Sequence, residues 1–215
     1  MVVADGEPAP EDAALARDAV LVVAADGGAR WLAAQGLRPH MLVGDLDSLD
    51  RHDIERLQGS GARVISHPAE KDASDTELAV QAAIAAGADR IVLLGALGGS
   101  RLDHELANVM LLVEPALSPV EIRLQRGTTL VRCISGAHSL AIEAGVGATV
   151  TLLPLGGDAI GVSTEGLNYP LQEETLVMGR SRGLSNVVVE QPASVSVRAG
   201  SLLVIEIGNK MEGES

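Results

Sequence analysis

The first part of the chain, up to about residue 117, alternates short aliphatic runs with helix-like segments, and this alternation restricts the fold most strongly. The aliphatic runs contain few polar residues, which is typical of strands covered by helices on both faces. The predicted strands are Val2–Ala4, Val20–Ala25, Met41–Val43, Arg63–Ser66 and Arg90–Gly95. Because strand–helix–strand repeats build parallel sheets, the sequence predicts an N-terminal, mostly parallel α/β domain.

Two helices of this region have recognisable ends. Residues Ser74–Glu77 read SDTE, which has the spacing of a capping box, and an alanine-rich segment follows as far as Gly87. A second helix is predicted from about Leu102 to Val113, because Pro115 cannot continue it.

The pattern changes after Pro119. Short segments with better polar–apolar alternation, beginning with EIRLQ at 121–125, are separated by glycines and other turn residues. This texture predicts an antiparallel β-sandwich or barrel. We therefore expect two domains, an α/β domain at 1–120 and a β-sandwich domain at 121–215.

Composition excludes several classes of function. The formal net charge is -13, and the chain has one Trp, one Tyr and no Phe, which disfavours nucleic-acid binding. Cys133 is the only cysteine, so no intrachain disulfide is possible. The N-terminus lacks the pattern of a secretory signal, and its longest apolar stretch, 19–25, is too short to span a bilayer. We predict a cytoplasmic protein without a membrane partner.

Acidic residues follow the predicted strands. Asp26 follows the second strand, Asp45 and Asp47 the third, Asp75 the fourth and Asp103 the fifth. Ligands of parallel sheets bind at the carboxyl ends of strands, so these residues are expected at one edge. Taken singly, Asp26 fits better as a turn former or helix N-cap, and Asp75 could simply interact favourably with the dipole of its helix.

A shared Mg²⁺ ion would explain the acidic cluster as a whole. Two carboxylates about 4 Å apart repel by roughly 4 kcal/mol at an effective dielectric constant near 20. A divalent cation removes this repulsion, and Mg²⁺ prefers oxygen ligands. Asp45 and Asp47, two apart in a segment expected to be extended, would point the same way and bind one ion.

The glycine-rich turn at Gly98–Arg101 precedes a predicted helix. Its amides could bind phosphate oxygens and Arg101 could clamp them, although an ordinary tight turn has the same composition. The chain contains no Walker A motif, no G-x-G-x-x-G and no G-x-S-x-G, and Cys133 has no evident histidine partner. Covalent catalysis is therefore disfavoured.

Four segments, taken together in their order and spacing, resemble those of thiamine pyrophosphokinases. They are ADGGARWL at Ala25–Leu32, GDLDS at Gly44–Ser48, KDASDTELA at Lys71–Ala79 and GALGGSRLDHELAN at Gly95–Asn108. Two looser segments, Ser163–Leu171 and Arg182–Asn186, resemble the thiamine-site segments of that family. The resemblance covers nearly the whole chain.

The resemblance implies a fold, a reaction and a set of site residues. The family combines an α/β domain with a β-sandwich, works as a homodimer, and transfers pyrophosphate from ATP to the hydroxyl of thiamine with Mg²⁺, giving thiamine diphosphate and AMP. The implied metal ligands are Asp45, Asp47 and Asp75, which with Arg101 and Asp103 form the implied catalytic set. The implied ATP-binding residues are Asp26, Gly27, Ser48, Asp72, Gly99, Arg101, His104 and Asn108. Thiamine would be received by Tyr169, Ser185 and Asn186, from the partner subunit.

The sequence departs from the family pattern at two informative positions. Leu46 stands between the aspartates where an aromatic residue is common, and Tyr169 stands where a tryptophan often stacks on thiamine. A tyrosine ring can also stack on a flat heterocycle. Two alternatives stay open: a pyrophosphokinase acting on a hydroxymethyl-dihydropterin, and a noncatalytic sensor of thiamine or nucleotide.

Overall fold

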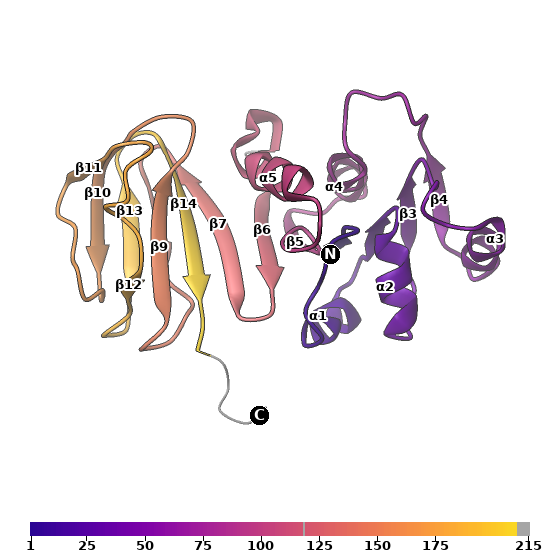
Figure 1. The fold of residues 1–215 in the computed structure, drawn as a ribbon, viewed down its shortest axis with the longest axis horizontal. Coiled ribbons are helices and arrows are strands. Elements are labelled where there is room, and N and C mark those ends of the chain that lie inside the picture. Colours follow the sequence, from indigo (N-terminus) through magenta and orange to yellow (C-terminus); the bar gives the residue numbers. More distant parts are fainter. Residues whose placement is uncertain (118, 210–215) are drawn as a thin grey trace. The chain divides into compact units, whose positions relative to one another are not determined.

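The computed structural model describes residues 1–117 and 119–209. Ser118 and residues 210–215 lie outside it, so the last six positions of the predicted β-sandwich domain are not described. The chain divides into two compact units, Met1–Gly127 and Thr128–Ser215, whose elements are labelled in Figure 1.

The N-terminal unit is built on a parallel sheet. Its strands within the described residues are β1 (Val2–Val3), β2 (Val23–Ala25), β3 (Met41–Gly44), β4 (Arg63–Ser66), β5 (Arg90–Leu94) and β6 (Glu121–Arg126). They lie in the order β6-β5-β1-β2-β3-β4, and every neighbouring pair is parallel. The predicted parallel α/β architecture is confirmed.

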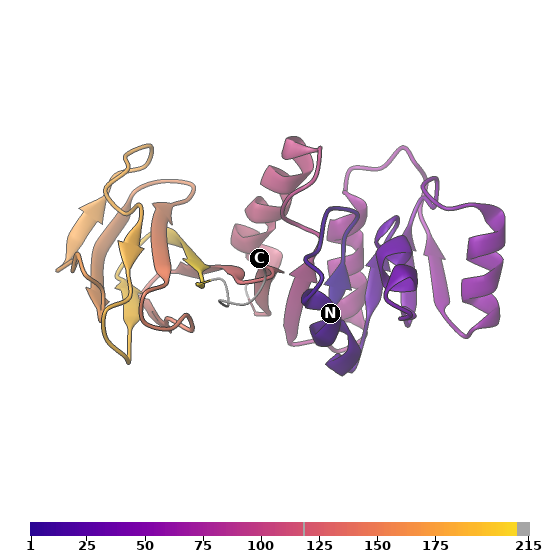
Figure 2. The same ribbon diagram turned by 60° about the horizontal axis from the view of Figure 1, so that its bottom comes forward.

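Helices flank this sheet, as Figure 1 and the turned view of Figure 2 show. They are α1 (Asp12–Asp18), α2 (Gly28–Ala34), α3 (Arg51–Gly59), α4 (Asp75–Ala85) and α5 (Leu102–Met110), followed by 3₁₀ turns at Leu111–Val113 and Pro115–Leu117. Ala16, Leu32 and Leu57 place α1, α2 and α3 in one apolar cluster with Val3 and Leu42 of the sheet. No helix among the described residues is both long and apolar enough to cross a membrane.

Helix α4 begins and ends where the sequence predicts. The Ser74 hydroxyl accepts a hydrogen bond from the Glu77 amide at 3.2 Å, which caps the helix. Its last residue is Ala85, and Gly87 has a φ of 93°, which suits the end of a helix. The helix buries Ala79 and Val80 and packs against β1, β2 and β3.

The segment EIRLQ differs from its prediction. Its polar alternation predicts a strand of the antiparallel domain, but the segment forms β6, which pairs parallel with β5 through Ile91 and Ile122. Only Leu124 of β6 is fully buried, so the strand shows the polar alternation of a half-exposed antiparallel strand. The alternation alone therefore could not identify its partner.

The C-terminal unit is an antiparallel β-sandwich, as predicted. Its strands are β7 (Thr129–Ser135), β8 (His138–Ala141), β9 (Thr149–Pro154), β10 (Ala159–Glu165), β11 (Glu174–Leu176), β12 (Asn186–Val187), β13 (Ser194–Val197) and β14 (Ser201–Ile207). One sheet has the order β12-β9-β14-β7 and the other β11-β10-β13-β8. Val150 and Val204 of the first sheet and Val162 and Val195 of the second share one apolar core.

A buried ion pair lies beside this core. The Glu206 side chain is 1% exposed and accepts hydrogen bonds from Arg132 and from the amides of Glu143 (2.7 Å) and Ala144 (2.8 Å). Arg132 also donates to Glu143 Oε1 at 2.9 Å and to Ala141 O at 2.8 Å. The pair thus fixes the chain that follows β8 to β14.

We expect Glu206→Gln to lower the free energy of unfolding by about 3 kcal/mol, because Arg132 loses its buried partner and a side-chain amide donor faces backbone amides. Urea denaturation followed by far-UV circular dichroism measures this. The control is Glu55→Gln in the exposed Arg51–Glu55 pair, which should cost less than about 1 kcal/mol. Equal losses in the two variants would contradict the assigned role of Glu206.

Candidate functional site

The N-terminal unit has a cavity of about 390 Å³ at the carboxyl ends of its strands. The cavity is lined by the residues that follow β1, β2, β3 and β5 and by the start of α4 and one side of α5. Strand β1 lies between β2 and β5, so the strand order reverses direction beside it, which opens a crevice in such sheets.

Three aspartates gather in this cavity. One carboxylate oxygen from each of Asp26, Asp45 and Asp47 lies within 4.8 Å of the other two. Leu46, between the last two, has a φ of 66°, so this segment is a left-handed turn and not the extended chain we expected. The turn, rather than strand alternation, brings the two carboxylates to the same place.

Asp26 has a buried carboxylate oxygen without a hydrogen-bond partner among the described residues. It is 7% exposed; the Ser48 hydroxyl donates to its Oδ2, whereas its Oδ1 is buried with no hydrogen-bond partner among the described residues. Burial raises the pKa of Asp26, the Ser48 hydrogen bond opposes this, and the charges of Asp75 and Asp47 raise the pKa further. Such a buried, unsatisfied carboxylate oxygen suits a cation.

Lys71 connects two further carboxylates. Its Nζ lies 3.0 Å from Asp45 Oδ2 and 2.9 Å from Asp75 Oδ1. The hydrogen bond from Lys71 lowers the pKa of Asp45. Asp75, which the sequence places among the metal ligands, is thus bound by an ammonium in this structure, and Asp26 completes the aspartate trio instead.

The glycine loop and α5 form another wall. Gly98 and Gly99 have φ values of 75° and 101°, conformations that favour glycine. Arg101 Nε and Nη2 donate to Asp103 Oδ1 and Oδ2 at 2.9 and 2.6 Å, and this pairing holds the pKa of Asp103 well below its usual range. Arg101 lines the cavity and Asp103 does not. A carboxylate held in this way is a weak proton acceptor.

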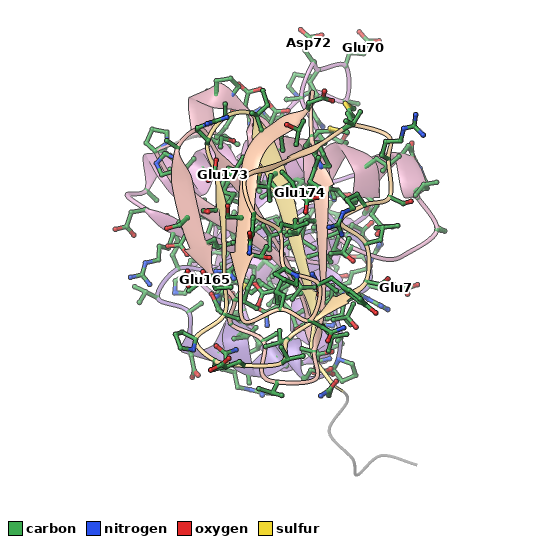
Figure 3. The ribbon with its side chains drawn as sticks, turned by 90° about the vertical axis from the view of Figure 1, so that its left-hand side faces the viewer. Glu7, Glu70, Asp72, Glu165, Glu173 and Glu174 are labelled. Carbon is green, nitrogen blue, oxygen red and sulfur yellow. The ribbon has the colours of Figure 1, made fainter. Side chains whose placement is uncertain are left out.

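The remaining predicted ATP-binding residues are placed differently from one another. Ser48, Gly99, His104 and Asn108 line the cavity, and Asn108 Nδ2 donates to Ala96 O at 3.1 Å, which ties α5 to the loop after β5. Gly27 and Asp72 do not line it. Asp72 is exposed on the loop between β4 and α4, where Figure 3 labels it beside Glu70.

The predicted thiamine residues lie in the C-terminal unit. The Asn186 side chain is buried and accepts from Tyr169 N at 3.0 Å and donates to Tyr169 O at 2.7 Å. Its amide group is therefore engaged within the protein and fixes the backbone at Tyr169. Tyr169 is 60% exposed. Ser185 is exposed, and its amide donates to Thr151 Oγ1 at 3.0 Å.

Asp5 and Arg30 shape the cavity but are not among the residues predicted from the sequence. Asp5 lines it directly after β1, and the rule applied to the other strands would have found it. Arg30 of α2 donates to Ser48 O at 2.6 Å and pairs with Asp5 at 3.1 Å, so it ties together the loops after β1 and β3. Nothing in the sequence pattern distinguishes Arg30 from an ordinary helix-surface residue.

Comparisons with known proteins identify the family of the chain. The family model described as "Thiamin pyrophosphokinase, catalytic domain" matches residues 13–124, and "Thiamin pyrophosphokinase, vitamin B1 binding domain" matches 137–202. Thiamine pyrophosphokinase of Bacillus subtilis (strain 168) is 26% identical over 86% of each chain. Thiamine pyrophosphokinase 1 of Oryza sativa subsp. japonica is 27% identical over 80% of this chain and 67% of its own.

Solved structures share the fold. Thiamine pyrophosphokinase from Bacillus subtilis superposes with a TM-score of 0.84 at 24% identity, covering 97% of this chain and 99% of its own. A thiamin pyrophosphokinase family protein from Enterococcus faecalis superposes with a TM-score of 0.82 at 28% identity, covering 97% and 98%. Both coverages include the two units of this chain.

We expect Asp26→Asn to stabilise the metal-free protein by about 1 kcal/mol near neutral pH, because it removes a buried charge that two other carboxylates repel. The raised pKa of Asp26 means that the folded state binds this proton more tightly than the unfolded state. The gain should therefore be full above the raised pKa of Asp26, should fall as the pH drops through it, and should vanish below about pH 3, where the wild-type group is protonated in both states.

Thermal unfolding in the presence of EDTA, measured across this pH range, tests the expectation. Asp89→Asn, a change of the same kind at an exposed aspartate, serves as the control and should move the midpoint little. A lower midpoint for Asp26→Asn at neutral pH would refute the electrostatic reading of the cavity.

Proposed function

The chain belongs to the thiamin pyrophosphokinase family, and we propose that it transfers pyrophosphate from ATP to the hydroxyl of thiamine at the aspartate-lined cavity. The products are thiamine diphosphate and AMP. The main observation that supports this cavity as the active site is the buried Asp26 Oδ1. It has no hydrogen-bond partner among the described residues and lies beside Asp45 and Asp47. We place the reaction in the cytoplasm.

The residues of the cavity fit a Mg²⁺ ion. Asp26, Asp45 and Asp47 offer hard oxygen ligands close enough to share one ion, and Asp75 stands beside them as the fourth carboxylate. Mg²⁺ held there would offset the negative charge of the triphosphate oxygens and of the leaving AMP. The predicted metal set of Asp45, Asp47 and Asp75 is extended by Asp26 in this proposal.

Pyrophosphoryl transfer depends mainly on positioning and charge neutralisation. The amides of Gly98 and Gly99 and the guanidinium of Arg101 are donors on the cavity wall, where triphosphate oxygens would bind. Asp103 fixes the guanidinium plane of Arg101, so we assign it a positioning role within the predicted catalytic set. Ser48 holds the Asp26 carboxylate through its hydroxyl group.

The two domains divide the substrates between them in this proposal. The unit Met1–Gly127 binds ATP with Mg²⁺, and the unit Thr128–Ser215 binds thiamine. In the C-terminal domain the exposed Tyr169 ring offers a flat surface for the thiamine ring, and the buried Asn186 keeps the backbone of Tyr169 in place. Ser185, next to Asn186, is an exposed hydroxyl available to the same ligand.

The acceptor is tested by measuring AMP. Purified protein with ATP and Mg²⁺ should release AMP when thiamine is added and should release little with 6-hydroxymethyl-dihydropterin or with no acceptor. Release with the pterin alone would favour the pterin pyrophosphokinase. Release with neither acceptor, together with measurable thiamine binding, would favour the noncatalytic sensor.

We expect Asp47→Asn to lower kcat for AMP formation at least about 100-fold, because a neutral amide replaces an anionic metal ligand. Asp89→Asn, at an exposed position, should retain wild-type activity. Circular dichroism and the unfolding midpoint should match the wild type in both variants. A nearly unchanged kcat in Asp47→Asn would remove Asp47 from the metal site.

An apolar stripe on α5 supports the proposed homodimer. Leu102, Leu106 and Met110 recur at intervals of four residues and are each at least half exposed. Arg101, on the same segment, lines the cavity. Apolar side chains grouped on one helix face of a soluble protein usually mark an interface. We therefore place the subunit contact at this stripe, so that the partner subunit borders the active site.

Leu106→Glu should convert the dimer to a monomer at micromolar concentrations, because it puts a charge in the centre of the stripe. Light scattering coupled to size-exclusion chromatography measures the mass directly. Val20→Glu is the control, since Val20 is an almost fully exposed apolar residue outside α5. A Leu106→Glu protein of dimeric mass would exclude the stripe as the interface.

A further inference from the structure

We propose that Lys71 is an internal counter-ion of the aspartate cluster, and that its ammonium is displaced from Asp45 when Mg²⁺ binds. This inference rests on the metal site of the proposed function. It concerns a residue that is neither a predicted metal ligand nor a lining residue of the cavity.

The geometry places the Lys71 ammonium between two carboxylates from different loops. Nζ lies 3.0 Å from Asp45 Oδ2 and 2.9 Å from Asp75 Oδ1. Asp45 belongs to the loop after β3, and Asp75 is the first residue of α4. The Lys71 side chain is only 14% exposed. A lysine at a surface loop normally extends into water, so this largely covered position indicates that the two carboxylates stabilise the ammonium.

No other cation of the described residues is available to the cluster. Arg30 pairs with Asp5, and Arg101 pairs with Asp103. Among the described residues, Asp26 and Asp47 have no ion-pair partner, although their negative charges repel each other. Lys71 is therefore the residue that neutralises part of the cluster when no metal is bound.

Asp45 is the residue that both cations need. It belongs to the trio whose oxygens can share one ion, and it is also the partner of Lys71. An ammonium and a Mg²⁺ ion on one carboxylate repel each other at short range. The divalent ion should prevail, because carboxylate oxygens are its preferred ligands and Asp26 adds a ligand that Lys71 does not contact.

Displacement from Asp45 does not require Lys71 to leave the site. Its second partner, Asp75, remains, and the four-carbon stem allows the ammonium to turn while the backbone stays in place. The freed donors of the ammonium would then face the cavity, where phosphate oxygens of ATP are proposed to bind. Lys71 would thus exchange a carboxylate contact for a role in positioning the substrate.

The sequence makes this movement directly observable, because Lys71 and Lys210 are the only lysines of the chain. Protein labelled with lysine carrying ¹³C at Cε gives one signal for each, and a Lys210→Arg variant assigns them. Titration with Mg²⁺ alone, against choline chloride of equal ionic strength, should shift the Lys71 signal saturably and leave the Lys210 signal unchanged.

Calorimetry on the same sample separates the outcomes. Mg²⁺ binding with an unmoved Lys71 signal would overturn this inference and leave the metal site standing. Absence of Mg²⁺ binding would overturn both the displacement of Lys71 and the proposed metal site. If Mg²⁺ binding measured by calorimetry has the same midpoint as the shift of the Lys71 NMR signal, the result supports the displacement of the ammonium from Asp45 by Mg²⁺.

Two variants provide a second measurement. Lys71→Met keeps the length of the side chain without its charge, so it should bind Mg²⁺ about tenfold more tightly, because no cation competes for Asp45. It should also unfold at a lower temperature than the wild type in EDTA, and Mg²⁺ should remove this difference. Lys71→Arg keeps the charge and should bind Mg²⁺ like the wild type. Weaker or equal Mg²⁺ binding by Lys71→Met would overturn the competition.

Discussion

Mutual repulsion among carboxylates is the constraint on which this site depends. Asp26, Asp45, Asp47 and Asp75 converge from two loops and one helix start onto one edge of the sheet. Each pair of unscreened charges at such distances is unfavourable, and the burial of Asp26 adds to the cost. The arrangement persists because the parallel sheet around it is rigid, and because Lys71 and Ser48 satisfy part of the charge. A site arranged in this way is ready to bind a cation and needs little rearrangement to do so.

The backbone makes this convergence possible at a few positions where a side chain would not fit. A Cβ added at Gly44 would lie 3.0 Å from Asp75 Oδ1 and 3.1 Å from Asp26 Cβ, so glycine allows those two residues to approach. A Cβ added at Gly28 would lie 2.1 Å from Val3 O, so glycine allows the start of α2 to pack directly on β1. Asp26 itself has a φ of 43°, a strained conformation for a residue other than glycine. Strain and charge repulsion thus occur at the same place, which is common where function, and not stability, has determined the residues.

The sequence predicted the larger features because they follow from local rules. Aliphatic runs between helical segments identified the parallel strands, and the capping-box spacing at Ser74 identified the start of α4. The partner of β6 could not be predicted, because polar alternation reports exposure and not strand direction. The left-handed Leu46 was also hidden, since leucine rarely adopts this conformation and no local signal marks it. Asn186 looked like a ligand-binding side chain, and only the folded chain reveals that its amide is engaged by the backbone of Tyr169.

The proposed functions of the two units determine which of these incorrect predictions affect the proposed site. Charge neutralisation and phosphate positioning require specific atoms at specific distances, and the N-terminal unit supplies them from a rigid sheet edge. In the proposed function, recognition of a flat acceptor requires mainly an exposed ring, and the C-terminal unit offers Tyr169, whose backbone is held by the Asn186 side chain. A tyrosine can therefore take the place of a larger aromatic residue there, because the Asn186 side chain acts on the backbone and is independent of the ring. In the aspartate cluster no comparable freedom exists, since replacing one carboxylate changes the charge balance of all the others.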